Sequence, residues 1–442
     1  MNWKGLASAA ALAVLACGSA AFASQEQQAG SFTGGSQFVN PQLLDDMTTM
    51  PATAPASAPA ETTLTPVMFL LDPTPVGQWL EKNKITFSGF VDGGYFYNTS
   101  APRISEQPTD IVFPGPFSNR ALLDQIDFSI QKQVDTTQKN FDFGFMFENL
   151  YGTDGAYIHS HGILDNRPPK DPQNQYDIDQ AFATLFIPVG NGLTLKAGKF
   201  VTLLGNETIS PLTNQFYSHS YNFSYGIPFT QMGLLAAYTF PALIGGKDLS
   251  VNAGFTRGWN QSFRDNNGAI DFLGEVTYSP TDKLALTMNL SEGPEATNDN
   301  SDYWTVVEGL AAYTVSDQLT VTGDFLYGDF PHGATTNPGQ SEQWYGAVGY
   351  AGYKINSYFT LNARGEWYRD QGGFTVGTQA NYYELTLGTQ IHPLPNDNIF
   401  QYLQIRPEIR GDAADRRVFN SSHSGGGDYS ELTAAVDVIM QF

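Results

Sequence analysis

The amino-acid sequence predicts an all-β protein: an antiparallel, up-and-down β-barrel of about 16 strands that crosses a membrane. Three observations lead there: hydrophobic residues alternate with polar ones through many long segments, connections alternate between short and long, and the chain begins with an export signal. After that signal, no other apolar run approaches the ~18 residues that a membrane helix needs. Lipid offers the backbone no hydrogen bonds, so a chain that enters a membrane without helices must close its sheet.

The export signal spans residues 1–23. Lys4 supplies a positive start, residues 6–17 form a short apolar stretch, and Ala21-Phe22-Ala23 is a cleavage site before Ser24. An alternative takes Cys17, the only cysteine, as a lipidated residue. Either route takes the protein out of the cytoplasm. Residues 24–83 should then form a periplasmic tail rich in Pro, Ala and Thr, with one short helical turn at 76–81.

Residues 84–442 carry the period of two that is typical of strands with one apolar and one polar face. In one such segment, Leu284, Leu286, Met288 and Leu290 alternate with small or polar residues. The pattern places sixteen strand starts, although 14 or 18 strands remain alternatives. The starts fall near residues 85, 122, 141, 178, 193, 231, 249, 270, 283, 303, 319, 344, 358, 381, 400 and 432.

The connections show which face of the strands meets lipid. Short links, such as 188–192 and 316–318, alternate with long ones, such as 99–121 and 201–230. Short periplasmic turns and long external loops are typical of an outer-membrane barrel, and a soluble sandwich has no reason for that rule. Aromatic residues near strand ends, including Tyr95, Tyr238 and Trp367, suit the membrane interfaces. The apolar faces should therefore point outward.

The last strand ends with Val438, Met440 and Phe442 on one face. A terminal phenylalanine that closes an alternating strand is a feature that the barrel-assembly machinery reads, so these three residues form a candidate assembly signal. Pro407 falls on the outward face of the preceding strand, where it cannot donate to the ladder, and we expect a β-bulge there.

Several function classes are excluded or disfavoured. A formal net charge of −22 argues against nucleic-acid binding. The six histidines all fall in loops or turns, and neither G-x-S-x-G nor H-E-x-x-H occurs, so we expect no enzyme, no catalytic residue and no cofactor. His159 and His161 could touch a metal, but two loop histidines are more often solvated, and we assign no metal site.

Several segments carry a family resemblance. They are 71–80 followed by ITFSGFVDGGY (85–95), IDQAF (178–182), PVGNGL (188–193), GKF (198–200), 205–207, FYSHSY (216–221), 225–226 and RPEIR (406–410). With these segments the chain resembles, over about residues 70–442, the OmpL-like β-barrel porin family of gram-negative outer membranes. The resemblance implies a barrel with pore activity in the outer membrane, without a particular solute.

The third long loop, 201–230, is the candidate pore constriction, because the loop at that place in general porins folds into the lumen. Its candidate residues are neutral polar, aromatic or acidic, and the alternative is an ordinary external loop. They are Glu207, Asn214, Tyr217, His219, Tyr221 and Tyr225.

Charged residues at a spacing of two should line the lumen on three C-terminal strands, where charge tunes selectivity. These candidate wall charges either pair across strands or face Glu207 across the eyelet. They are Arg364, Glu366, Glu384, Arg406, Glu408, Arg410 and Asp412. On the other strands, inward acidic residues such as Asp92 and Asp324 outnumber Lys196, so we expect a mild cation preference.

Together, these features predict an outer-membrane porin for passive diffusion of small polar solutes and ions. A plugged-barrel surface or adhesion protein is the alternative. Expected partners are outer-membrane lipid and lipopolysaccharide, the barrel-assembly machinery and small hydrophilic solutes, with a monomer or a homotrimer as the assembly state.

Overall fold

The computed structural model describes residues 65–99, 119–137, 139–165, 174–333, 339–419 and 427–442. The expected signal peptide, Cys17, the first 41 residues of the expected tail (24–64) and parts of several long loops therefore lie outside the described residues. No helix within these ranges is long and apolar enough to span a membrane.

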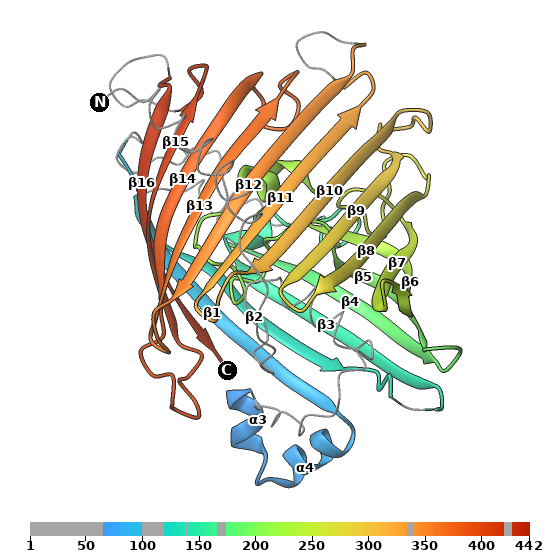
Figure 1. Ribbon diagram of the computed structural model, residues 1–442. Helices are drawn as coiled ribbons and strands as arrows, with labels where there is room; N and C mark the ends of the chain where they lie inside the picture. Colours follow the sequence, from blue (N-terminus) through green and yellow to red (C-terminus); the bar gives the residue numbers. More distant parts are fainter. Residues whose placement is uncertain (1–64, 100–118, 138, 166–173, 334–338, 420–426) are drawn as a thin grey trace.

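Sixteen antiparallel strands form one closed barrel, which confirms the predicted fold (Figure 1). Every strand pairs with its neighbours in sequence, and β1 pairs with β16 to close the sheet. The strands are β1 (Ile85–Asn98), β2 (Arg120–Lys132), β3 (Asp142–Gly152), β4 (Gln175–Ile187), β5 (Leu193–Val201), β6 (Thr230–Ile244), β7 (Lys247–Thr256), β8 (Asp271–Thr281), β9 (Leu284–Pro294), β10 (Tyr303–Thr314), β11 (Leu319–Phe330), β12 (Glu342–Lys354), β13 (Phe359–Asp370), β14 (Ala380–Ile391), β15 (Gln404–Ala414) and β16 (Ser430–Gln441).

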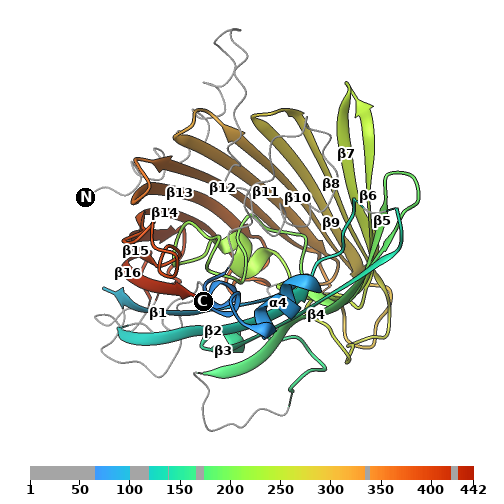
Figure 2. The same ribbon diagram turned by 90° about the horizontal axis from the view of Figure 1, so that it is seen from below.

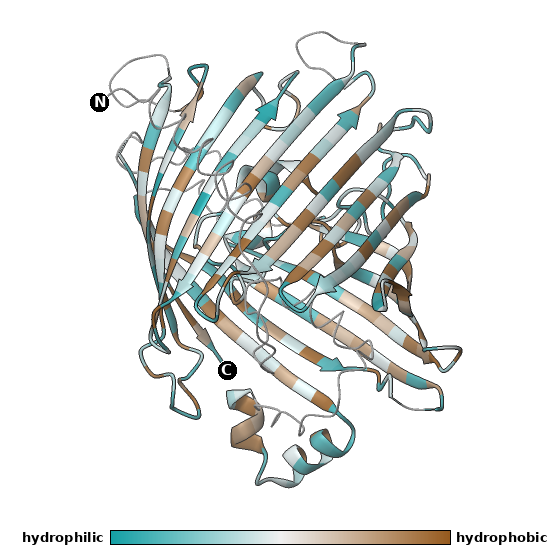
Figure 3. Cartoon of the chain, viewed as in Figure 1, coloured by the Kyte–Doolittle hydropathy of each residue, from teal (hydrophilic) through white to brown (hydrophobic). Residues whose placement is uncertain are grey.

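Side chains alternate between the outer surface and the lumen, and Figure 3 shows the resulting alternation of apolar and polar bands along the strands. On β9, Met288 is exposed on the outside while its neighbour Asn289 is fully buried inside. Apolar side chains on an outer surface need lipid around them, since water would penalise their exposure.

Short and long connections alternate as the sequence predicts. Strands β6 and β7 are joined by Gly245 and Gly246, whose φ angles of +57° and +77° suit glycine in a tight hairpin. Long segments connect this hairpin to its neighbours: 202–229 joins β5 to β6, and 257–270 joins β7 to β8. The connection 392–403 between β14 and β15 is longer than the pattern suggests.

Residues 65–84, which precede β1, lie at the end of the barrel where β1 begins and β16 ends (Figure 1). They contain the helices α3 (Pro66–Leu71) and α4 (Pro75–Lys82). Phe442 extends the pairing of β16 by exchanging backbone hydrogen bonds with Gly89 of 2.7 and 3.1 Å. Beyond that point the edge of β1 meets α3 instead: the Thr65 hydroxyl donates to the Phe87 carbonyl at 2.8 Å, and the Phe87 N–H approaches the Met68 sulfur.

Two local expectations are wrong. The predicted bulge at Pro407 is absent, because the register with β14 and with β16 is the same on both sides of the proline. The pairing with β14 is interrupted opposite Pro407, because proline has no N–H to donate, and it resumes in the same register. Strand β15 also begins at Gln404 rather than near residue 400, since residues 400–402 form turns.

Candidate pore constriction

The inserted loop, residues 202–229, connects β5 to β6 and folds into the barrel. In the view along the barrel (Figure 2), its helical part lies inside the ring of strands. That part is η3 (Asn222–Gly226), a π-helical turn. Most of the loop is buried, including large side chains such as Phe216, Tyr221 and Phe223. Because the barrel wall surrounds the loop, its partners come from strands that are distant in sequence.

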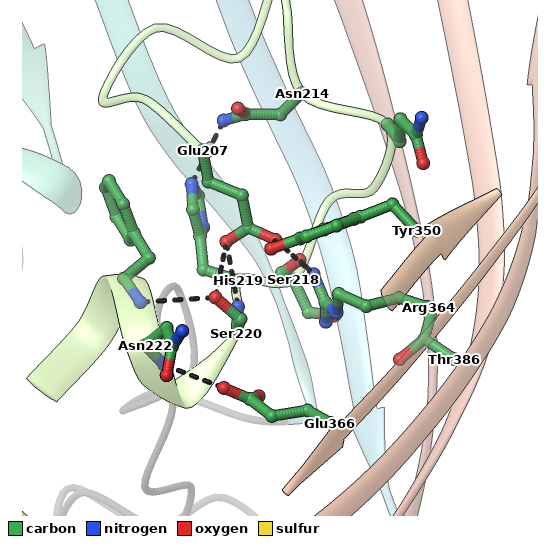
Figure 4. Close-up of polar contacts among 12 residues, drawn as sticks. Glu207, Asn214, Ser218, His219, Ser220, Asn222, Tyr350, Arg364, Glu366 and Thr386 are labelled. Atoms are coloured by element: carbon green, nitrogen blue, oxygen red, sulfur yellow. Dashed lines mark hydrogen bonds and ion pairs between the residues drawn. The ribbon is translucent and has the colours of Figure 1, made fainter. Parts of the chain in front are cut away.

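Glu207 is the centre of one group of contacts between the loop and the wall (Figure 4). Its carboxylate accepts hydrogen bonds from Arg364 of β13 at 2.7 Å, from the Ser220 N–H at 2.8 Å and from the Tyr350 hydroxyl at 3.1 Å. Burial alone would raise the pKa of Glu207, but the Arg364 charge and the hydrogen bonds from Arg364 and the Ser220 N–H bring the pKa below its usual value. Glu207 is therefore ionised at neutral pH, and it contacts Arg364 directly instead of facing it across an opening.

His219 and Asn214 stabilise the loop through contacts with other residues of the loop itself. The His219 Nε2 lies 3.1 Å from the Asn214 amide and 3.2 Å from the Thr208 carbonyl, and its ring stacks on Phe223 with centroids 4.3 Å apart. Burial lowers the pKa of His219 to about 4, against the attraction of Glu207. The imidazole is therefore neutral at physiological pH and supplies no positive charge to the lumen.

The wall holds the loop mainly by its backbone. Glu366 accepts the N–H groups of Tyr221 and Asn222 at 2.7 and 2.8 Å, where η3 begins. Glu408 accepts the N–H groups of Tyr217 and Ser218 at 2.8 and 3.2 Å. Charged acceptors make stronger hydrogen bonds than neutral ones, and they satisfy loop N–H groups that have no ladder partner.

Three arginines of the wall donate to loop carbonyls in the same way. Arg406 donates to the carbonyls of Pro211 and Asn214 at 2.9 and 2.8 Å. Arg364 and Arg410 reach the carbonyls of Ser218 and His219 at 2.7 and 2.6 Å.

The predicted tyrosines join the loop to β2 and β15, the two strands that flank the β1–β16 closure of the barrel. The Tyr217 hydroxyl donates to Asp124 of β2 at 2.8 Å, and the Tyr221 hydroxyl donates to Asp412 of β15 at 3.0 Å. Tyr225 stacks against Tyr221 at a centroid distance of 6.2 Å. The sequence-predicted loop residues thus lie together inside the barrel.

The candidate wall charges face the lumen, but the inserted loop covers them. All seven side chains are buried, whereas the sequence pattern alone placed them in open water. The arginines are also neutralised locally: Arg364 contacts Glu384 at 3.2 Å, Arg410 contacts Asp412 at 2.8 Å, and Arg406 pairs with Asp437. The arrangement is a set of ion pairs under a loop: two of them join neighbouring strands, and the Arg410–Asp412 pair lies within β15.

An apolar cluster inside the barrel contains residues that the sequence analysis missed. Trp344 of β12 is fully buried, and its indole N–H donates to the Gly226 carbonyl at 3.1 Å. Tyr368 and Tyr382 lie 6.1 and 5.2 Å from the Tyr221 ring. The period of two does place Trp344 on the lumen face, so a signal existed, but it does not show that a loop would pack there.

A second wall of the lumen is acidic. Asp127, Glu148 and Asp179, on β2, β3 and β4, each place a carboxylate oxygen within 4.8 Å of the others. Three such oxygens could hold a cation, but the positive charge of Lys199 lies close enough to act on Asp179. We therefore assign no metal to these three residues.

The partly exposed part of the lumen wall lies on β5–β7. Lys196, Ser250 and Asn252 are only half-buried there, while the lumen-facing charged residues of β13–β16 are buried. The Lys196 ammonium lies over the rings of Phe182 and Phe200, at 4.8 and 5.9 Å from their centroids.

Solved structures share this fold. An anion-selective porin from Comamonas acidovorans aligns with a TM-score of 0.54 and 13% identity, over 81% of this chain and 99% of that one. OmpF of Salmonella typhi, solved in complex with daunomycin, aligns with a TM-score of 0.52 and 15% identity, over 81% and 98%. The outer-membrane channel DcaP of Acinetobacter baumannii aligns with a TM-score of 0.50 and 12% identity, over 81% and 97%. At these identities the likeness shows the fold alone.

No curated protein matches the chain significantly. A family model does match: the family described as "Putative beta-barrel porin-2, OmpL-like" aligns with residues 84–442, which is the whole barrel. Family and fold both place the protein in the outer membrane of a gram-negative cell. The chain is therefore a member of the OmpL-like beta-barrel porin-2 family.

Proposed function

We propose that this porin passes small polar solutes and ions by passive diffusion, through a lumen that the inserted loop narrows. The observation that supports this most is the position of residues 202–229, which enter a closed 16-strand barrel and bind its inner wall. Barrels of this size have a wide lumen unless loops fill part of it. The loop binds the side of the barrel that runs from β10 through the β1–β16 closure to β2, and the half-buried polar residues of β5–β7 are the expected lining of the remaining path.

We also propose a mild cation preference. The arginines that line the lumen form ion pairs with carboxylates. Inward carboxyl groups, such as Asp92 and Asp127, outnumber the inward lysines and arginines among the described residues, and the half-buried Lys196 faces the less covered sector. An excess of negative groups along a pore attracts cations. The Comamonas porin, which is described as anion-selective, would then differ from this one.

The direct test is planar-bilayer recording of the purified protein, followed by reversal potentials in a salt gradient. Discrete conductance steps with reversal toward the cation equilibrium potential support the proposal. Steps with reversal toward the anion potential would contradict the selectivity and leave the pore intact. A correctly folded barrel that never conducts would contradict the pore itself.

A plugged barrel without channel activity is the second candidate, and the apolar cluster favours it. Trp344, Tyr368 and Tyr382 are fully buried against the loop, so that side of the lumen carries no water path. The same recording decides between the two candidates. The proposed partners are lipid and lipopolysaccharide outside, the assembly machinery at Val438, Met440 and Phe442, and further copies of the chain in a homotrimer.

A further inference from the structure

The inserted loop also meets the wall at a buried pair of carboxylates on β10 and β11. Glu308 and Asp324 face the lumen on adjacent strands, where Glu308 pairs with Leu326 and Leu310 pairs with Asp324. This register puts the two acidic side chains on one diagonal, and they contact each other. Both are almost fully buried, and no lysine, arginine or histidine forms an ion pair with either of them among the described residues.

The remaining partners of Glu308 are neutral. One carboxylate oxygen, Oε2, accepts the Gly205 N–H from the loop and the Asn289 amide from β9, both at 2.8 Å. The other oxygen, Oε1, has no hydrogen-bond partner in the described structure, and neither does Oδ1 of Asp324. Two adjacent carboxylates in a region of low dielectric constant repel each other unless they share a proton or bind a cation.

A third side chain, Asn222, reaches this pair from the loop. It is the first residue of η3, its backbone N–H binds Glu366, and its carboxamide lies beside Asp324. Asn222 is 1% exposed, and apart from its contact with Asp324 neither its side-chain oxygen nor its nitrogen has a hydrogen-bond partner in the part of the chain that the structure describes. Native proteins rarely leave a buried amide with so much unused hydrogen-bonding capacity, so Asn222 indicates that a ligand belongs there.

Gly346 of β12 makes room for this amide. A methyl group on Gly346 would lie 1.6 Å from the Asn222 oxygen, so an alanine there would push Asn222 out of its place. The wall therefore accommodates Asn222 closely, and the amide is positioned next to the two acids by the surrounding structure.

We propose that Glu308, Asp324 and Asn222 bind a divalent cation, Ca²⁺, which fastens the inserted loop to β10 and β11. The three side chains offer hard oxygen donors, and two carboxylates balance the charge of a divalent ion; Ca²⁺ accepts carboxylate and carboxamide oxygens in irregular geometry. The ion would join residues of the wall to the first residue of η3. The site does not depend on whether the barrel conducts.

Calorimetry tests the site on the full protein, purified from outer membranes in detergent, stripped with EDTA and titrated with CaCl₂ at pH 7.5. The double variant Glu308→Gln, Asp324→Asn should bind one Ca²⁺ fewer per chain than the parent protein. The matched control is Asp271→Asn, Glu295→Gln, a buried carboxyl pair at another place in the barrel, which should keep the parent stoichiometry. Asn222→Ala should weaken binding at least tenfold.

Hydrogen exchange of residues 217–226 supplies a second readout, since an ion that binds only the docked loop slows its opening. At a Ca²⁺ concentration of 100 Kd, exchange through loop opening should slow by about 100-fold in the parent and remain unchanged in the double variant.

Parent-like stoichiometry and affinity in the double variant would overturn the proposal, as would a parent protein that binds no Ca²⁺ at all; Glu308 and Asp324 would then share a proton. If the double variant does not fold, Asn222→Ala and Gly346→Ala carry the same test, because the first removes the amide and the second displaces it, and neither changes the charge.

Discussion

Replacing Arg364 with methionine tests how the inserted loop is held. The guanidinium is buried, donates to Glu207 and to the Ser218 carbonyl at 2.7 Å each, and contacts Glu384 at 3.2 Å. Methionine fills much of the same volume but leaves Glu207 and Glu384 buried without the cation between them. Removal of one partner from a buried ion pair typically costs about 3–5 kcal/mol. We expect this cost to fall on the docked state of the loop, because β13 keeps its ladder bonds in either state.

Hydrogen exchange measures that cost directly. A loss of about 3–5 kcal/mol corresponds to two to three and a half powers of ten in the population of the undocked loop. The N–H groups of Tyr221 and Asn222 should exchange faster by this factor, provided that they exchange through loop opening. Single-channel conductance should rise and become noisier, because the undocked loop no longer narrows the lumen.

Arg369→Met is the matched control on the same strand. Arg369 is partly exposed and lies 3.9 Å from Asp415, so its loss should cost no more than about 1 kcal/mol. If Arg364→Met exchanged and conducted like the parent protein, or like Arg369→Met, the reasoning about the buried ion pair would be wrong.

Four further predictions concern pH, selectivity, assembly and packing. Burial lowers the pKa of His219 from 6.5 to about 4, so between pH 6.5 and pH 4 the docked loop binds fewer protons than a released loop. The free energy that favours the docked loop should therefore fall by up to ~3 kcal/mol as the pH drops through this range. His219→Gln should flatten that dependence in hydrogen exchange, and an unchanged slope would assign it to other groups. Lys196→Glu should increase cation selectivity in reversal-potential measurements, since Lys196 lies in the less covered sector of the lumen; no shift would place the ion path elsewhere. Deletion of Phe442 removes two backbone bonds to Gly89 and the proposed assembly signal, so folded barrel per cell should decrease on heat-modifiability gels, and a normal yield would remove Phe442 from that role. Trp344→Phe loses the bond to the Gly226 carbonyl and should destabilise the docked loop by about 1 kcal/mol, seen as roughly fivefold faster exchange of residues 222–226; unchanged exchange would show that this bond contributes little.

Much of the barrel follows from the sequence because a period of two is a strong constraint. With lipid on one side of the sheet and a polar lumen on the other, every second residue must be apolar and face outward. The starts of β1, β5, β10 and β11, at residues 85, 193, 303 and 319, could therefore be predicted to the residue. The pattern fails at residues 400–403. Their apolar and aromatic side chains resemble those of a strand, but residues 400–402 form turns and β15 begins only at Gln404. At Pro407, the missing N–H was foreseen, but the strand tolerates the missing hydrogen bond to β14 without forming a β-bulge.

The loop site could be predicted only in part. Alternation identifies the inward faces of Arg364, Glu366 and Arg410, and the composition of 201–230 identifies a candidate insert. Neither reveals which residue meets which, because Glu207 and Arg364 are 157 residues apart and no spacing rule connects them. The burial of the wall charges was missed for the same reason: a strand pattern fixes the face on which a side chain lies, and only the packed loop shows what covers it.

Planar-bilayer recording of the purified protein tests the central claim most directly, namely that a closed barrel with an inserted loop still leaves a water-filled path. Stepwise single-channel conductance, which increases when Arg364→Met releases the loop, is the predicted result. A heat-modifiable, correctly folded barrel that stays silent both as the parent protein and as Arg364→Met would contradict it.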